Sequence, residues 1–215
     1  MVMPATVLLA AVSLAATWGW WKFAAVLLIG FHTLLRPSEV LFATHSHLIL
    51  PGDLLSALMI AYVRVDVPKT DRVYPKQHGK ISEVLVVEFL SAMYDDYPPH
   101  KFLCGGSAAQ FRNRWNAVFS SLGLPVMEAD SGVTPSALRG SGATWLHHVT
   151  EDIARIQWRG RWKRIHTLES YLQETAAQIL LSSVSKAHRA RISELASYTE
   201  ALLNSFILSR NSRST

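Results

Sequence analysis

The chain has 215 residues, of which 49% are apolar or aromatic and 17% are charged, a composition that supports a sizeable core and excludes a largely disordered protein. The 21 Lys and Arg against 16 Asp and Glu give a net charge of +5, which favours polyanionic partners. Because Cys104 is the only cysteine, an internal disulfide and a multi-cysteine zinc site are excluded.

An apolar stretch opens the chain. Residues 5–35 contain one charge, Lys22, and Gly19 divides them, so we predict two core helices over 5–17 and 21–35. Insertion of this stretch in a membrane is the alternative, but each piece is shorter than the roughly 20 residues that a span requires. The second helix should end near Arg36, because the residue before a proline avoids the helical conformation.

The middle of the chain predicts a small sheet and one amphipathic helix. Residues 58–67 alternate and are rich in β-branched side chains, which indicates a strand. The polar residues 68–80 indicate a hairpin or loop, and residues 81–90 begin as a strand and continue as a helix. A helical apolar stripe covers residues 107–122, where Gly123 is placed to end the helix.

The C-terminal half is predicted to be helical. Thr134 and Pro135 are expected to open a helix that reaches about His148. Asp152 is expected to cap a helix over 153–158 that Gly160 ends. Thr167 is expected to cap another helix, which carries Tyr171, and residues 174–208 form a long helical stretch with a break near 182–185. The predicted fold is therefore mainly α with a small antiparallel β-sheet (α+β).

Residues 155–164 (RIQWRGRWKR) hold five cations, no anion and two tryptophans. This pattern is typical of a surface that faces phosphates. We predict that Arg159, Arg161, Lys163 and Arg164 contact DNA, whereas Trp158 is expected to be a core anchor.

Two fragments, residues 34–40 (LLRPSEV) and 134–144 (TPSALRGSGAT), resemble two sequence boxes of the tyrosine recombinase, or phage integrase, family. The first is similar to the box of the first catalytic arginine, here Arg36, with its acidic partner at Glu39. The second is similar to the box of the second arginine, here Arg139. The residues 138–144 (LRGSGAT), together with 160–162 (GRW), are similar to those of divergent eukaryotic, mobile-element-like members.

A third fragment completes the resemblance in order and spacing. Trp162 stands where the family has His or Trp, and Tyr171 follows nine residues later, at the spacing of the nucleophile. The family's lysine is best matched by Lys69, with Lys76 as the alternative. The resemblance implies that residues 1–208 form a single catalytic domain without the family's N-terminal core-binding domain, and residues 209–215 are expected to be a disordered tail.

The resemblance also implies an activity: DNA cleavage and rejoining through a 3′-phosphotyrosyl intermediate, without metal or other cofactor. The implied partners are double-stranded DNA and further copies of the chain on DNA, in the nucleus or nucleoid, without a membrane. Two guanidinium groups suit the charge that develops on the phosphate oxygens. The implied catalytic residues are Arg36, Lys69, Ser136, Arg139, Trp162 and Tyr171.

Two positions depart from the family pattern. Ser136 stands where the family usually has His or Lys, and Gly140 replaces a second His. A serine can donate a hydrogen bond to a phosphate but supplies neither positive charge nor a base near neutral pH. The alternative is therefore a DNA-binding relic without turnover. Taken singly, Arg36 can also be a residue that caps the preceding helix, and Tyr171 a half-buried core residue.

Overall fold

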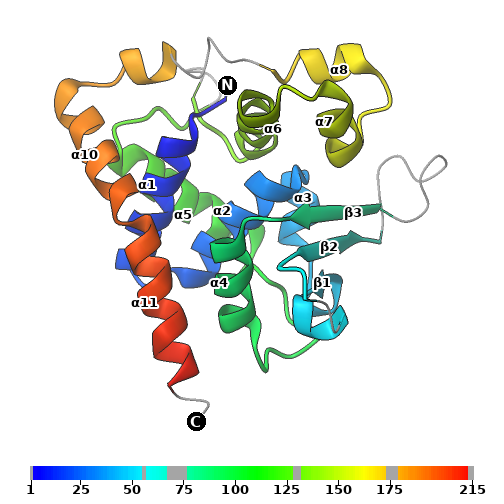
Figure 1. The fold of residues 1–215 in the computed structure, drawn as a ribbon. Helices are drawn as coiled ribbons and strands as arrows, with labels where there is room; N and C mark the ends of the chain where they lie inside the picture. Colours follow the sequence, from blue (N-terminus) through cyan, green and yellow to red (C-terminus); the bar gives the residue numbers. More distant parts are fainter. Residues whose placement is uncertain (1, 55–56, 67–76, 128–131, 173–178, 213–215) are drawn as a thin grey trace.

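The computed structural model describes residues 2–54, 57–66, 77–127, 132–172 and 179–212. Within these residues the protein is mainly helical with one small antiparallel sheet, as the sequence predicts (Figure 1). The helices are α1 (Ala5–Thr17), α2 (Trp21–Thr33), α3 (Pro37–Leu41), α4 (Val84–Tyr94), α5 (Ala108–Ser121), α6 (Ala137–Thr150), α7 (Ile153–Gly160), α8 (Ile165–Glu169), α10 (Lys186–Ser197) and α11 (Thr199–Asn211), with short 3-10 helices η1 (His45–His47) and η2 (Pro51–Leu54). The strands are β1 (Leu48–Ile49), β2 (Ala61–Val65) and β3 (Gln77–Ile81).

Helices α1 and α2 form the centre of the core. Most of their residues are buried, and Gly19, with φ +75°, makes the turn between them. The prediction of two core helices is confirmed, although α2 ends at Thr33 because Leu34 adopts the left-handed conformation. Each helix has 13 residues, and no described helix has the length and apolarity needed to cross a membrane.

The sheet has the order β1-β2-β3, and both pairs are antiparallel. The strand predicted over 58–67 is confirmed as β2, which is shorter. Strand β3 begins at Gln77 and so occupies part of the stretch predicted to be a hairpin or loop. Its sequence hides the strand because two of its buried positions are Gln77 and Gly79, and a side chain at Gly79 would overlap Thr33 of α2.

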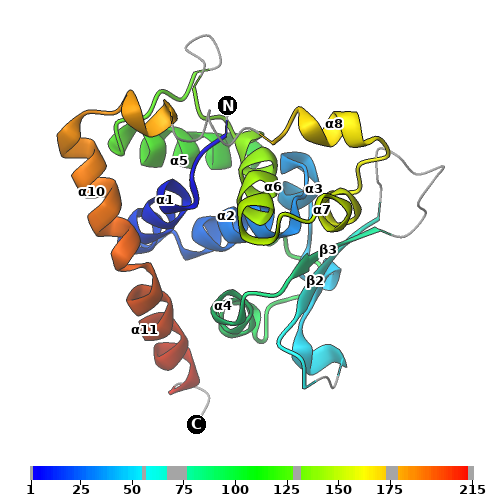
Figure 2. The same ribbon diagram turned by 45° about the horizontal axis from the view of Figure 1, so that its top comes forward.

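Helices α6, α7 and α8 lie together above the sheet in Figure 1, and Figure 2 shows α6 beside α7. Helix α6 crosses α2 so closely that a side chain at Gly142 would overlap the carbonyl of Phe31. The predicted starts of α6 and α8 are wrong. Helix α6 begins at Ala137, after a turn that contains Pro135, and α8 begins at Ile165, before Thr167.

Helix α7 continues through Gly160 instead of ending before it, and Arg161, with φ +58°, is the residue that ends it. Asp152 caps its start as predicted, because the side chain accepts a hydrogen bond from the backbone N–H of Arg155. Helix α8 ends at Glu169, so Tyr171 follows this helix instead of lying within it.

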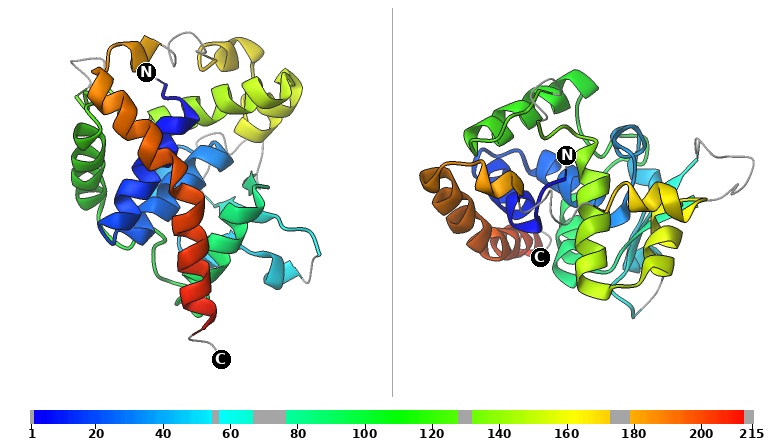
Figure 3. Two further views of the ribbon diagram at one scale, coloured as in Figure 1. Left: turned by 60° about the vertical axis from the view of Figure 1, so that its left-hand side comes forward. Right: turned by 90° about the horizontal axis from the view of Figure 1, so that it is seen from above.

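The C-terminal helices run along one side of the molecule (Figure 3). Helix α10 packs on α1, and α11 packs on α4 and α1. A buried hydrogen bond of 2.9 Å between the hydroxyls of Ser13 and Thr199 joins α1 to the start of α11. The predicted break near 182–185 is present before α10, and α11 reaches Asn211, which makes the first residues of the expected tail helical.

Candidate active site

A cavity of about 600 Å³ lies where four segments of the chain meet. Its lining comes from Val2 near the N-terminus, the junction of α2 with α3, the start of α6 and the residues after α8. Four of the predicted catalytic residues line it: Arg36, Ser136, Arg139 and Tyr171. Residues that are distant in the sequence therefore share one cavity, as the resemblance requires.

Arg36 stands at the N-cap position of α3, in extended conformation. Its Nη1 donates to Glu39 Oε1 at 2.9 Å, and its backbone N–H donates to Glu39 Oε2 at 2.7 Å. The side chain keeps 31% of its surface exposed, so the rest of the fork is open toward the cavity. Glu39 thus fixes one edge of the guanidinium and leaves the other edge available.

Arg139 is nearly fully buried on the first turn of α6. Its Nη2 donates to the carbonyl of Gly160 at 2.6 Å, and its guanidinium lies over the ring of Trp162 at 4.6 Å. Burial, followed by the charges of Arg36 and Arg161, lowers the pKa of Arg139 to about 10. The group is therefore still charged at neutral pH.

Tyr171 is half-buried and belongs to a small apolar cluster with Trp162. The two ring centroids are 5.2 Å apart, and the guanidinium of Arg139 lies 6.0 Å from the centroid of the Tyr171 ring. Its backbone carbonyl accepts a hydrogen bond from Thr144 Oγ1 at 3.1 Å, which ties the segment to α6. No described residue hydrogen-bonds the phenol oxygen, and the residue faces the cavity.

Ser136 and Gly140, the two departures from the family pattern, both line the cavity. Ser136 is exposed, and its hydroxyl bonds the hydroxyl of Thr134 at 2.7 Å. A Cβ at Gly140 would lie 2.9 Å from Val2 and 3.4 Å from the ring of Tyr171. The glycine therefore gives the N-terminal segment and Tyr171 room to pack on α6.

Trp162 is buried and lies beside the cavity wall, where its ring contacts Arg139 and Tyr171. A side chain at Gly160 would overlap this ring, so the indole can pack here only because residue 160 is a glycine. Trp162 thus contacts two other predicted catalytic residues, Arg139 and Tyr171, although it lines a different cavity.

The basic stretch 155–164 is not one exposed surface, which corrects the prediction for two of its arginines. Arg159 is buried and donates Nη2 to the carbonyls of Lys80 and His32, which ties α7 to β3 and α2. The side chain of Arg161 is also buried, and its Nη2 bonds Glu39 Oε2 at 2.7 Å. Neither side chain is placed to meet a phosphate on the surface.

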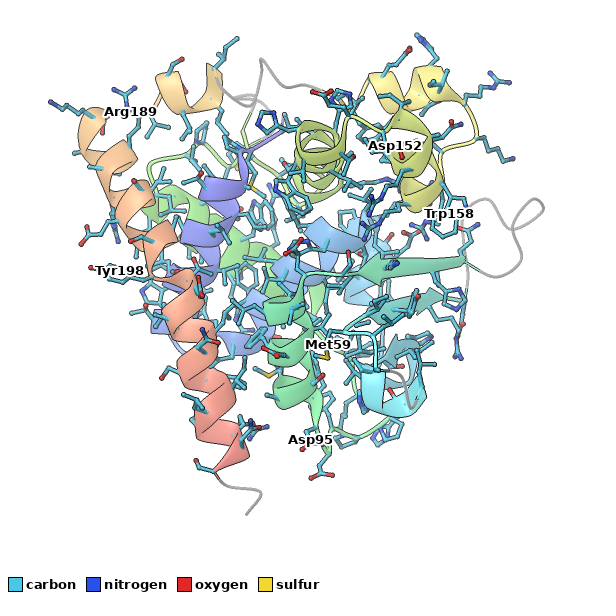
Figure 4. The ribbon with its side chains drawn as sticks, viewed as in Figure 1. Met59, Asp95, Asp152, Trp158, Arg189 and Tyr198 are labelled. Carbon is cyan, nitrogen blue, oxygen red and sulfur yellow. The ribbon has the colours of Figure 1, made fainter. Side chains whose placement is uncertain are left out.

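Lys163 and Arg164 are exposed, and their contact with DNA stays a prediction. Trp158 was predicted to be a core anchor, and this is wrong: 76% of its surface is exposed. Figure 4 shows Trp158 on α7, near the start of β3. Lys69 and its alternative Lys76 lie outside the described residues.

The sequence did not reveal that Glu39 bonds two arginines, Arg36 and Arg161. Burial alone would raise the pKa of the Glu39 carboxyl, but Arg161 and Arg36 lower it overall. Because Arg161 is far from Glu39 in the sequence, no spacing rule connects them. This region holds the guanidiniums of Arg36, Arg139 and Arg161 with one carboxylate, and the resulting positive charge makes it suited to an anion.

The chain matches no protein-family model, and no curated protein sequence matches it significantly. A function for the chain therefore has to be inferred from its residues and their geometry.

Proposed function

We propose that the protein cuts and rejoins DNA through Tyr171, as a strand transferase similar to the tyrosine recombinases. The observation that carries this proposal is that Arg36, Ser136, Arg139 and Tyr171 line one cavity. An excess of positive charge beside a tyrosine whose phenol oxygen accepts and donates no hydrogen bond among the described residues suits a phosphodiester approached by a phenol.

The chemistry follows from these groups. The phenol oxygen of Tyr171 attacks phosphorus, the bond from phosphorus to the 5′ oxygen breaks, and the DNA is joined to the protein through a 3′-phosphotyrosine. The phenol loses its proton and the departing 5′ oxygen gains one, so the step is balanced. Arg36 and Arg139 stabilise the charge on the nonbridging oxygens, and Ser136 donates a hydrogen bond to one of them. Attack by a 5′ hydroxyl reverses the step and reseals the strand.

A second function is a DNA-binding module without turnover. The observation that favours it is Ser136, which places an uncharged hydroxyl in the cavity where the family has His or Lys. In this form the arginines bind a phosphate and Tyr171 does not react.

Trapping of the covalent intermediate tests the first function. The substrate is a pool of DNA duplexes of random sequence in which a bridging 5′ sulfur replaces the 5′ oxygen, because the released thiol does not reverse the attack efficiently. We expect a denaturant-resistant protein–DNA adduct whose modified peptide contains Tyr171. Tyr171→Phe should abolish the adduct, and Tyr198→Phe, at an exposed tyrosine between α10 and α11, should leave it unchanged.

Two outcomes contradict strand transfer. One is an adduct that persists in Tyr171→Phe, and the other is DNA binding without an adduct. The second outcome, combined with a binding constant that falls steeply with salt, supports the DNA-binding module instead.

Ser136→His addresses the departure from the family pattern directly. If the serine only weakens the site, we expect the histidine variant to raise the rate of adduct formation, because an imidazole adds a donor that can carry charge. An unaltered adduct yield would contradict this explanation of Ser136.

A further inference from the structure

A second cavity, of about 630 Å³, lies between α7 and the sheet. Its walls come from β1 and η2, from Tyr62 of β2 and the start of β3, and from α7 with the residues that follow it. None of the residues that line the first cavity lines this one. The strand-transfer chemistry proposed above leaves this cavity without a role.

Flat apolar surfaces dominate the second cavity. Tyr62 of β2 and Trp158 and Trp162 from the α7 region contribute aromatic rings, and His78 of β3 stands edge-on to Tyr62 at 6.5 Å between centroids. Trp158 is unusual because 76% of this large indole is open to solvent, and no described aromatic ring packs against it within stacking distance. An exposed indole at the mouth of a cavity is a stacking surface for a planar ligand.

The charged groups of the cavity are cations. Arg161 and Lys163 line it, and no acidic residue does so in the part of the chain that the structure describes. The Nε and Nη1 atoms of Arg161 are buried without a hydrogen-bond partner among the described residues. Gln157 donates its amide to the carbonyl of Trp162 at 3.1 Å, which leaves the amide oxygen as an acceptor at the wall. The cavity thus combines an apolar, planar interior with positive charge.

We infer that this cavity binds a nucleobase that is not paired, with its phosphate toward Lys163. A nucleotide is the ligand that joins a flat, stackable ring to negative charge, and these are the two properties that the walls complement. A paired base in a duplex has its faces covered by its neighbours, so only a displaced or single-stranded base can stack on Trp158.

The two cavities are neighbours, because residues that line the second contact residues of the first. The ring of Trp162 lines the second cavity and also contacts Arg139 and Tyr171, which belong to the first. Arg161 likewise lines the second cavity and bonds Glu39, which holds Arg36. A strand whose phosphate occupies the first cavity can therefore place a nearby base in the second, although base binding itself does not require cleavage.

Fluorescence anisotropy tests the inference in the full chain carrying Tyr171→Phe, so that strand transfer does not affect the reading. The probes are a short duplex, the same duplex with one unpaired adenine, and a single strand. We expect the two probes with unpaired bases to bind at least about fivefold more tightly than the paired duplex. Trp158→Ala should remove this preference, and Trp18→Ala, at an exposed indole between α1 and α2, should preserve it.

Adenosine monophosphate, added as a competitor, identifies the source of the base. If it displaces the single strand and binds as tightly, the cavity takes a free nucleotide; if it binds much more weakly, the base belongs to DNA. Equal affinity for paired and unpaired probes overturns the inference, and so does an equal effect of the two tryptophan variants. Loss of self-association in Trp158→Ala, without a base preference, also overturns it and assigns the cavity to contact between copies.

Discussion

The charges near Glu39 show why individual residues decide whether this site can form. Glu39 is the carboxylate that bonds both Arg36 and Arg161, and its side chain and that of Arg161 are almost fully buried. A buried guanidinium that loses its counter-charge keeps the cost of desolvation without the compensating attraction. Glu39 is therefore a positioning residue for Arg36 and a structural partner for Arg161.

Glu39→Gln is expected to lower the free energy of unfolding by about 2–4 kcal/mol, because Gln keeps the shape but removes the charge that faces Arg161. Urea unfolding at neutral pH measures this loss. The pKa of Glu39 is lowered in the folded protein, so its stabilising contribution is present above the ordinary carboxyl pKa and declines as the pH falls through the folded value. The difference in the free energy of unfolding between variant and parent should thus become smaller in acid, and a constant difference would contradict the ion-pair explanation.

His32 should make the protein sensitive to mild acid. Its ring packs beside Phe31 and Trp145, and burial, followed by the charge of Arg159, lowers its pKa from 6.5 to about 4. Between these values the unfolded chain binds a proton that the folded protein does not, so stability falls as the pH falls. Between pH 7 and pH 5, the free energy of unfolding of His32→Gln should fall by about 1–2 kcal/mol less than that of the parent.

Urea unfolding at both pH values measures that difference. His148→Gln, at an exposed histidine on α6, is the control and should keep the pH dependence of the parent. If His32→Gln loses as much stability as the parent, the ring is already protonated in the folded protein and the expectation is wrong.

Among the elements, the crossing of α2 and α6 determines whether Arg36 and Arg139 can approach one another. Arg36 follows α2, and Arg139 lies on the first turn of α6. The helices approach closely because Gly142 has no side chain to overlap the Phe31 carbonyl, while a Cβ at Gly30 would lie only 3.0 Å from Leu138. Two glycines, one on each helix, thus set the spacing of the proposed clamp.

Gly142→Ala is expected to destabilise the protein by about 1–3 kcal/mol, because a methyl group there overlaps backbone that cannot rotate away. The same variant should slow adduct formation more than its stability loss explains, since separating the helices separates the arginines. Gly52→Ala is the matched control, because a methyl group at Gly52 would meet no atom within 4 Å and the φ of this glycine is not positive. Equal thermal midpoints for both variants would argue against a tight crossing.

The sequence predicted elements well where burial follows a simple periodicity. The apolar residues of α1 and α2 and the stripe of α5 are strong helical signals, and the structure has helices at these positions. It predicted β3 poorly because the strand buries Gln77 and Gly79 in place of apolar side chains. The ends of α6, α7 and α8 were displaced by a few residues because packing against α2 and Trp162 overrides local capping signals.

Several residues of the candidate site were predictable from the sequence, but their hydrogen-bond partners were not. The family resemblance grouped Arg36, Arg139 and Tyr171, and all three line one cavity. Spacing could not reveal that Arg161 turns inward to Glu39, because this depends on the left-handed conformation at Arg161 and on a partner far away in the sequence. Nor could it show that Trp158 faces solvent, since an indole on a short helix is more often buried.

At the scale of the whole molecule, the last helices complete a core that the first helices begin. Helix α11 packs against α1 and α4, and the ring of Phe206 lies 4.6 Å from Trp21 and 5.3 Å from Phe89 between centroids. The ends of the described chain thus cover one apolar centre, whereas the cavity that holds Tyr171 is lined by none of the residues of α10 or α11. Helices α10 and α11 therefore contribute to the core and not to the lining of this cavity.

Because α11 packs on this core, truncating a buried side chain of α11 is predicted to destabilise the whole protein cooperatively. Leu203 is 2% exposed on α11, whereas Leu208 on the same helix is 69% exposed. Leu203→Ala should lower the free energy of unfolding by about 2–5 kcal/mol, because it opens a space beneath the helix, and Leu208→Ala should change it by less than about 0.5 kcal/mol. Circular dichroism and tryptophan fluorescence should report one shared transition in Leu203→Ala, since Trp21 and the C-terminal helix belong to the same core. Two separate transitions would instead mean that α11 unfolds independently and that the N-terminal helices form a core without it.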